Sequence, residues 1–317
     1  MHRFSRYPSA CVVALLLAAT AGAQSNLPSG SDPKPEDGVG FVLRMFERKP
    51  IVAIADLPGC EELHRFLRTL VQTSDFRLKV GTIVVDFGNP ALQPLIDRYV
   101  LDGELVPESV LRHVWDDTTE SPNLTWDSPV YAQFFDAVRA ANLAAPKEKR
   151  IRVVLGDAPI LWRKVQTTEQ WLAFTGQARE QALAERLNEV LNKQQRALVI
   201  AARSHLLRTP GETMNAYALI EKAHPGQVFV VVPQSRFGAR DMYKQIEARE
   251  ETMPVGSIVV VRDTWLGSVP VSDDPKSQHL QDAAGRQVGP AKPRGEADKV
   301  LDARGGTGLP ARSQLVQ

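Results

Sequence analysis

The stretch that decides the fold runs from residue 51 to residue 64 and reads Ile51-Val-Ala-Ile-Ala-Asp56-Leu-Pro-Gly-Cys-Glu-Glu-Leu-His64. An apolar run ends on an acid, a Pro-Gly turn follows, and a helical pattern begins. Residues 51–55 therefore predict a buried strand, and residues 61–73 predict a helix with one apolar face. In open α/β sheets, ligands bind beyond the carboxyl ends of the strands, so Asp56 is a turn former, a site residue, or both.

The same unit of apolar strand, turn and helix recurs along the chain. Further apolar runs predict strands at residues 79–85, 150–155, 196–201, 227–232 and 256–261. Helical patterns lie before and between these runs, at residues 41–48, 61–73, 91–100, 107–115, 129–142, 168–192, 213–223 and 241–249. Strands of continuous β-branched residues that alternate with helices are typical of a parallel sheet. We therefore predict a single α/β domain over residues 41–269, with helices on both faces of a mostly parallel sheet.

The first 23 residues have the pattern of a secretory signal peptide, with a basic start, an apolar run at residues 10–19 and an Ala-Gly-Ala cleavage site ending at Ala23. We therefore expect a secreted or periplasmic protein. The apolar run is shorter than the roughly 20 residues that a spanning helix needs, so we expect no integral membrane anchor after cleavage. Residues 24–40 and 270–317 are rich in Ser, Pro, Gly and charged residues, which predicts a disordered linker and a mostly disordered tail.

The composition and net charge of the chain indicate which kind of partner it binds. The chain has 317 residues, of which 43% are hydrophobic and 24% are charged, as in ordinary globular proteins. The formal net charge is +1, which gives no basic excess for binding nucleic acid. The chain contains no GxSxG elbow, no P-loop and no HExxH motif. We therefore predict a small-molecule ligand or substrate as partner.

Polar residues follow four of the predicted strands, at the edge where parallel strands end together. They are Asp56, Asp86, Asp157 and the turn Arg203-Ser204-His205. A single acid after a strand is most often a helix cap or a turn former. Several carboxylates beside one histidine can hold a metal or act as general acid and base, and clustered acids raise one another's pKa. We name Asp86, His205 and Asp56 as candidate catalytic residues.

Other residues near this edge have more than one interpretation. We assign Asp157, Arg203 and Arg163 to substrate binding, because two guanidinium groups can clamp an anionic substrate. His64 follows Glu61 by three positions on the first helix, and we interpret the two as a surface contact, with a ligand role as the alternative. Cys60 begins that helix, where a thiol pKa is lowered, so a Cys60 nucleophile paired with His205 is a further alternative; a small buried residue is the simpler interpretation.

Three segments carry a resemblance to a known group of proteins. They are IVAIADLPG at the first strand, TIVVDFGNP at the second and ALVIAARSHLLR at a late strand, and RVVLGDAPI and FVVVP add to the pattern. Together these segments resemble the erythromycin esterase-like, ChaN and TraB/Tiki superfamily across most of residues 50–235. In that group the first strand ends in a Gly-Glu-x-His type motif, the second ends on a Glu, and a late strand runs into a turn that carries a His.

This resemblance implies an exported, hydrolase-like α/β protein whose Glu and His residues activate water or hold a metal, and some relatives bind haem instead. By this alignment Asp56 and Asp86 replace the Glu residues, Pro58 replaces the first His, and His205 is unchanged. The departures imply hydrolysis with altered or reduced activity. The alternative is a non-catalytic protein that binds a small molecule or haem on the same scaffold. The sequence leaves the cofactor undecided, with a divalent metal and haem as the two candidates.

Overall fold

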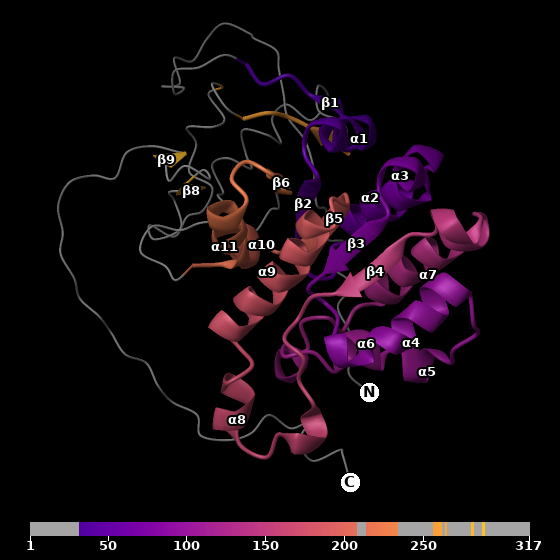
Figure 1. Cartoon of the computed structure of the whole chain (residues 1–317), viewed down its shortest axis with the longest axis vertical. Coiled ribbons are helices and arrows are strands. Elements are labelled where there is room, and N and C mark those ends of the chain that lie inside the picture. The colour runs from indigo at the N-terminus through magenta and orange to yellow at the C-terminus, as the bar shows by residue number, and fades with distance from the viewer. Residues whose placement is uncertain are drawn as a thin grey trace, which may run out of the picture.

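A five-stranded parallel sheet lies at the centre of the molecule, with its strands in the order β4-β3-β5-β2-β6 (Figure 1). The computed structural model describes residues 32–207, 214–233, 256–261, 264, 280–281 and 287–288. The strands of the sheet are β2 Ile51–Asp56, β3 Thr82–Val85, β4 Arg152–Leu155, β5 Ala197–Ala202 and β6 Val228–Val231. Helices lie on both faces of the sheet, so the predicted fold class, a single α/β domain, is confirmed.

The helices alternate with these strands along the chain. The α-helices of the described residues are α1 Gly38–Arg48, α2 Glu61–Gln72, α3 Ser74–Lys79, α4 Gln93–Asp97, α5 Glu108–Leu111, α6 His113–Asp116, α7 Pro129–Leu143, α8 Thr168–Leu172, α9 Gln177–Asn192, α10 Arg203–Leu206 and α11 Ala216–Ala223. Short 3-10 turns are η1 Pro90–Leu92, η3 Ser121–Asn123, η4 Lys147–Lys149 and η5 Trp162–Lys164, and the π-helix is η2 Arg98–Asp102. Helix α1 begins inside the expected linker, because the Asp37 carboxylate caps it by accepting from Gly40 N at 2.7 Å.

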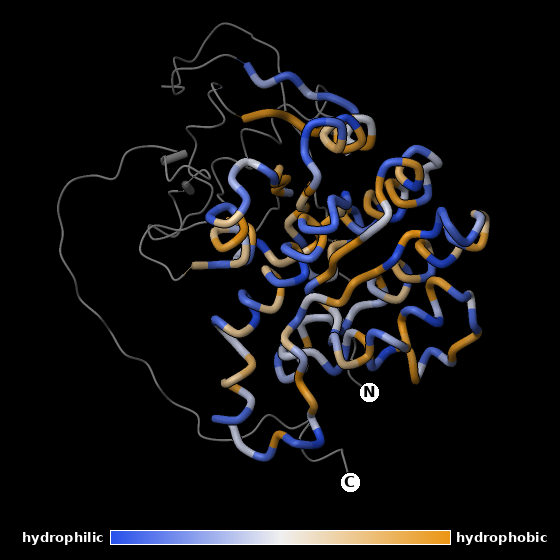
Figure 2. Tube along the Cα trace, in the orientation of Figure 1, coloured by the Kyte–Doolittle hydropathy of each residue, from blue (hydrophilic) through white to orange (hydrophobic). Residues whose placement is uncertain are grey.

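The sheet separates two hydrophobic cores. Alternate residues of a strand point to opposite faces, and β2 shows this clearly. Val52 and Ile54 belong to the core that contains residues of α1, α2 and α7. Ala53 and Ala55 belong to the core that contains residues of α9 and α11. Figure 2 shows the strands as largely apolar segments, whereas the surrounding helices alternate between apolar and polar residues.

The strands of the sheet end close together at one edge, which we call the carboxyl edge. Strand β5 lies between β2 and β3, so Asp56 is opposite Ala202 at the ends of β2 and β5. On the other side of the sheet, Val85 is opposite both Ile200 and Leu155. The residues that follow β2, β3, β4 and β5 therefore gather along the carboxyl edge.

The single long helix predicted at residues 168–192 is two helices, α8 and α9. Gly176 has a φ of +52° between them, a conformation that glycine adopts more readily than other residues. Helix α8 begins with a capping box, in which the Thr167 and Gln170 side chains accept from each other's backbone N–H groups. The chain thus turns before α9, and the first turn of α9 reaches the carboxyl edge.

The prediction of a sixth sheet strand at residues 256–261 is wrong. Within this segment Ser257–Ile258 forms β7, and it pairs antiparallel with Glu36–Asp37, which is β1. Gly38 N donates to Gly256 O at 3.0 Å, so this small sheet lies beside the start of α1. A second antiparallel pair joins β8 Leu280–Gln281 to β9 Gln287–Val288.

Three predicted segments lie wholly or mostly outside the described residues. They are the signal peptide at residues 1–23, the helix at 241–249 and the tail at 270–317. Of the linker predicted at 24–40, residues 32–40 are described, and they include β1 and the start of α1. Export therefore stays a prediction. Among the helices that the structure describes, none combines the length and the apolar character needed to cross a bilayer.

Substitution of Gly38 tests the close packing between the start of α1 and the residue before β7. A Cβ atom at Gly38 would lie 2.1 Å from Gly256 O and 2.9 Å from Phe66 Cε2, so Gly38→Ala forces β7 away from α1. We expect the free energy of unfolding to fall by about 1–3 kcal/mol, as in other overpacked sites. Urea unfolding followed by circular dichroism measures this. Gly81→Ala is the matched control, because a Cβ there has no neighbour within 4 Å among the described residues, and equal unfolding midpoints for the two variants would contradict this packing.

Candidate functional site

Three side chains from three elements meet at the carboxyl edge, and we call them the acid–histidine centre: Asp86, His205 and Glu180. Asp86 directly follows β3, and its Oδ2 accepts from Ala202 N at the end of β5, at 2.7 Å. His205 lies in α10, which begins immediately after β5. Its Nε2 is 3.6 Å from Asp86 Oδ2, and its Nδ1 is 2.9 Å from Glu180 Oε1 in α9. The structure thus brings together the predicted residues Asp86 and His205.

Burial has the largest effect on the protonation of Asp86. Asp86 is 1% exposed and His205 is 3% exposed. Burial raises the pKa of Asp86 to about 6, while His205 and Arg179 oppose the rise and the Asp56 carboxylate adds to it. A carboxyl group with a pKa this close to neutrality is suited to general acid–base chemistry.

Two atoms of the centre lack hydrogen-bond partners in the described part of the chain. They are Asp86 Oδ1 and His205 Nε2, and both are buried. Buried polar atoms in folded proteins are nearly always hydrogen-bonded, so such atoms call for an explanation. They are an acceptor and a ring nitrogen at one edge of the sheet, which is what a water molecule or a polar substrate group would contact.

The carboxyl edge holds a second group, formed by Asp56, His64 and Tyr131. His64 Nε2 lies 3.0 Å from Asp56 Oδ1, and the Tyr131 hydroxyl in α7 donates to Asp56 Oδ2 at 3.2 Å. Burial in the first place, and then the Asp56 and Asp86 carboxylates, raise the pKa of Tyr131, so its hydroxyl stays protonated as a donor. The charges of both carboxylates act on Tyr131, so the Asp56 group lies close to the acid–histidine centre.

The interpretation of His64 as a surface contact with Glu61 is wrong. His64 is fully buried, and Glu61 pairs instead with Arg68 at 2.7 Å. The sequence carried a signal for this: His64 follows Cys60 by four positions and precedes Leu67 by three, which is the spacing of one helix face. The face that buries Leu67 therefore turns His64 toward the sheet.

The hydrogen bonds of Asp157 go to residues other than the candidate catalytic ones. Its two oxygens accept from Thr119 N at 2.6 Å and from Thr119 Oγ1 at 2.8 Å, and Arg179 Nε lies 3.1 Å from Oδ1. Arg179 also pairs with Glu120. Burial raises the pKa of Asp157, and the contacts with Arg179 and Thr119 oppose the rise. The structure thus places Asp157 as a link that ties β4, α9 and the loop around residue 119.

The two arginines proposed for substrate binding are placed differently. Arg203 is half-buried at the start of α10, two positions before His205, and burial lowers its pKa. Arg163 is exposed in η5. No hydrogen bond or ion pair within the described ranges joins Arg163 to the candidate catalytic residues.

The structure also bears on two other possibilities for the carboxyl edge, a Cys60–His205 pair and a bound metal ion. Both ring nitrogens of His205 face carboxylates, of Glu180 and Asp86, which gives no support to the pairing of His205 with Cys60. Among the residues that the structure describes, no group of three or more His, Cys, Asp or Glu side chains is arranged to hold a metal ion.

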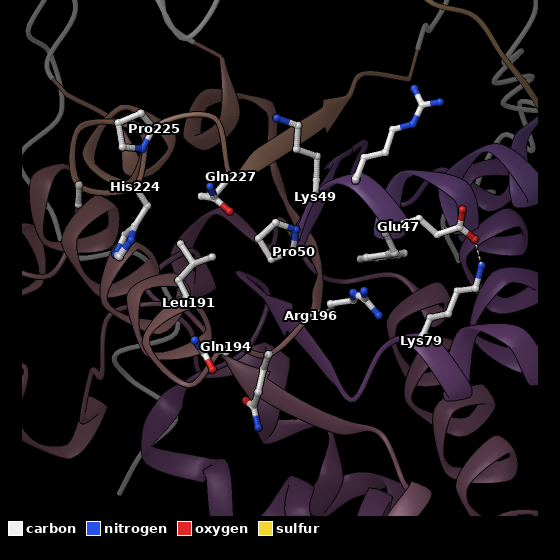
Figure 3. Close-up of a pocket in the computed structure, with 14 residues that line it drawn as sticks. Glu47, Lys49, Pro50, Lys79, Leu191, Gln194, Arg196, His224, Pro225 and Gln227 are labelled. Carbon is white, nitrogen blue, oxygen red and sulfur yellow. Dashed lines mark hydrogen bonds and ion pairs between the residues drawn. The ribbon is translucent and has the colours of Figure 1, made fainter.

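A wide hollow of about 910 Å³ lies at the opposite edge, where the strands begin (Figure 3). Pro50, Arg196 and Gln227, which directly precede β2, β5 and β6, line it, together with His224 at the end of α11. Helices α1, α9 and α11 all end at this hollow, so its basic side chains complement the negative ends of the helix dipoles. It shares no residue with the acid–histidine centre or the Asp56 group, and we place the candidate site at the carboxyl edge.

Comparisons with known proteins are distant. No protein-family model and no curated protein matches the chain. Solved structures that resemble it include the type III effector HopBA1, with a TM-score of 0.38 and 14% identity over 66% of this chain and 87% of that one. A structure described as "Bacterial protein toxins" has a TM-score of 0.41 and 20% identity over 62% of this chain and 37% of that one. RRSP, a MARTX toxin effector domain from Vibrio vulnificus CMCP6, has a TM-score of 0.35 and 20% identity over 55% of this chain and 32% of that one. Likenesses this distant indicate nothing about activity.

The raised pKa of Asp86 predicts a pH-dependent stability. Between its ordinary value of 3.8 and its folded value of about 6, the folded state binds more protons at Asp86 than the unfolded state does. Ionisation of Asp86 therefore costs stability as pH rises through this window, by about 3 kcal/mol at roughly 1.4 kcal/mol per pKa unit.

Asp86→Asn removes this titration. We expect the unfolding free energy of the variant, relative to the native chain, to improve by up to about 3 kcal/mol from pH 4 to pH 7 in urea titrations. Asp102→Asn, at an exposed position, is the control. Parallel pH profiles for the native chain and Asp86→Asn would rule out the proposed desolvation of Asp86.

Proposed function

We propose that this chain is a hydrolase of ester-type bonds in which Asp86 and His205 act as general base and general acid. The observation that carries the proposal is the pair of buried atoms, Asp86 Oδ1 and His205 Nε2, that have no hydrogen-bond partner within the described residues. The Asp86 pKa of about 6 supports it further, because the carboxylate is then a base near neutral pH. The short motifs that resemble the erythromycin esterase-like, ChaN and TraB/Tiki superfamily agree with it.

In the proposed reaction, Asp86 starts ionised and His205 starts protonated. Asp86 Oδ1 takes a proton from a water molecule as the water oxygen bonds to the carbonyl carbon. The tetrahedral intermediate then breaks its bond to the leaving oxygen, and His205 Nε2 gives that oxygen a proton. Transfer of the proton from Asp86 to His205 Nε2, which lies 3.6 Å from Asp86 Oδ2, restores the starting state. One proton thus passes through the pair in each cycle.

We assign Asp56 a positioning role in this reaction. Both of its oxygens already have partners, His64 Nε2 and the Tyr131 hydroxyl. Burial is the main cause of the raised Asp86 pKa, and the negative charge of Asp56 adds to that rise, which makes Asp86 a somewhat stronger base.

Hydrolysis of a panel of p-nitrophenyl and methylumbelliferyl esters tests the proposal. On any ester that the native chain cleaves, Asp86→Asn and His205→Gln should each lower kcat/KM by about 10²- to 10⁴-fold, the usual contribution of general acid–base groups. Circular dichroism and urea unfolding establish that each variant is folded. Asp102→Asn should keep full activity, and full activity in Asp86→Asn or His205→Gln would defeat the mechanism.

The pH dependence of the same reaction is a separate prediction. Asp86 is the active base only when ionised, so kcat/KM should rise about tenfold per pH unit below about 6, and it should fall again at higher pH where the general acid His205 loses its proton. Initial rates on one ester from pH 4 to pH 8 measure this. An activity that stays flat through this range would exclude Asp86 as the base.

One observation favours a second candidate function. Asp86 and His205 are 1% and 3% exposed, and an ester must reach them to react. This burial weighs against catalysis, and the alternative is a non-catalytic protein that binds a small molecule or haem on the same scaffold. Haem titration followed by visible absorption tests the haem version, which an unchanged Soret band at micromolar protein would eliminate.

A further inference from the structure

We infer that Glu180 is a positioning residue that fixes the tautomer of His205, with the proton on Nδ1 and with Nε2 turned toward Asp86. This inference deepens the proposed function and rests on it for its catalytic consequence. Glu180 belongs to the first turn of α9, and it is 25 positions from His205 in the chain. Only the packing of α9 against the carboxyl edge brings the two together.

The hydrogen bond from His205 leaves one choice of tautomer. Glu180 Oε1 lies 2.9 Å from His205 Nδ1. The other oxygen of this carboxylate accepts from a backbone N–H, and a carboxylate anion can only accept hydrogen bonds. His205 Nδ1 must therefore carry a proton. In the neutral imidazole the lone pair is then on Nε2, the nitrogen that faces Asp86 and has no hydrogen-bond partner in the described part of the chain.

The second oxygen of Glu180 is also held, which fixes the direction of the carboxylate. Oε2 accepts from Ala216 N at 2.7 Å, and Ala216 is the first residue of α11. The backbone N–H groups at the start of a helix are free to bind such an anion. Because both oxygens have partners, rotation of the carboxylate away from His205 would break both bonds.

The helix that carries His205 is tied to the same helix start. Asn215 caps α11, and its Nδ2 donates to Ser204 O at 2.9 Å and to Leu207 O at 2.7 Å. These two carbonyls lie on either side of His205 in the chain. The start of α11 therefore holds both the imidazole, through Glu180, and the backbone of α10, through Asn215. Together these hydrogen bonds of Glu180 and Asn215 keep His205 Nε2 directed toward Asp86.

Charged groups around His205 agree with this assignment. Asp86 faces the imidazole from the end of β3, and Glu180 faces it from α9. Arg179 and Asp56 act on Asp86, the first lowering and the second raising the Asp86 pKa. An imidazole between two carboxylates can hold a proton on each nitrogen, as the proposed cycle requires, and Glu180 keeps the Nδ1 proton throughout.

Nitrogen NMR of the native full chain, labelled with 15N-histidine, tests the assignment without any substrate. The His205 signal is identified by its absence in His205→Gln. We expect Nδ1 to be protonated at neutral pH, whichever state Nε2 adopts. A neutral His205 with its proton on Nε2 would overturn the inference, and this result does not depend on whether any Glu180 variant folds.

Glu180→Gln tests the consequence. An amide can donate to Nδ1 as well as accept from it, so we expect proton population to move from Nδ1 to Nε2 in the NMR spectrum. On an ester that the native chain cleaves, kcat/KM should fall by about 10²- to 10⁴-fold, as when the orienting acid of a catalytic triad becomes an amide. Glu185→Gln, at an exposed position of the same helix, should change neither readout. An unchanged His205 spectrum in folded Glu180→Gln would contradict the inference.

The two readouts separate this inference from the function on which it rests. If His205 has the expected tautomer and Glu180→Gln shifts it, but no ester is hydrolysed, the proposed hydrolase fails while the positioning role of Glu180 stands. If esters are hydrolysed with Asp86 and His205 required, but the tautomer is the opposite one, the hydrolase stands and the role of Glu180 is overturned.

Discussion

The hydrogen bond between Ala202 N and Asp86 Oδ2 is the interaction on which the carboxyl edge depends. Asp86 N already donates to Ile200 O, which extends the pairing of β3 with β5 by one residue. The Asp86 side chain then accepts from the N–H of Ala202, the last residue of β5. Directly after this contact the chain turns into α10, which carries His205. One carboxylate thus both binds the end of a neighbouring strand and faces the histidine of the site.

Helix α9 connects two neighbouring parts of this edge through consecutive residues. Arg179 reaches Asp157 beyond β4, and Glu180 reaches His205 beyond β5. Successive residues of a helix point about 100° apart, so the first turn of α9 can serve both strands. Strand β3 lies between β4 and β5, so α9 also brings the Arg179 charge near Asp86, where it opposes the effect of burial on the Asp86 pKa. The glycine that separates α8 from α9 lets this turn begin where both contacts are made.

The features that follow local rules were predictable from the sequence, and those that need tertiary packing were not. The apolar runs that end in Asp56 and Asp86 are local, and parallel strands end at a common edge, so these acids were found. The common edge of parallel strands also predicts the position of Asp157. It does not predict that Thr119 and Arg179 donate hydrogen bonds to the Asp157 carboxylate. His64 was assigned from its spacing to Glu61, while its true partner, Asp56, lies across a turn in which Gly59 has a φ of +72°. Glu180 carried no signal at all, since a Glu in an Ala- and Leu-rich helix is ordinary.

The position of β2 in the sheet has a consequence for how the chain folds during synthesis. This strand is the first of the sheet to be synthesised, yet it lies between β5 and β6. Ile51 therefore cannot pair with Ala197 and Val228 until those later residues have been synthesised. Loop closure over such long separations makes folding slow, because the entropy is lost before the contacts form. The emerging chain therefore holds an apolar strand with open edges until most of the domain has been translated. Chaperones that bind extended apolar segments would find β2 available throughout that interval.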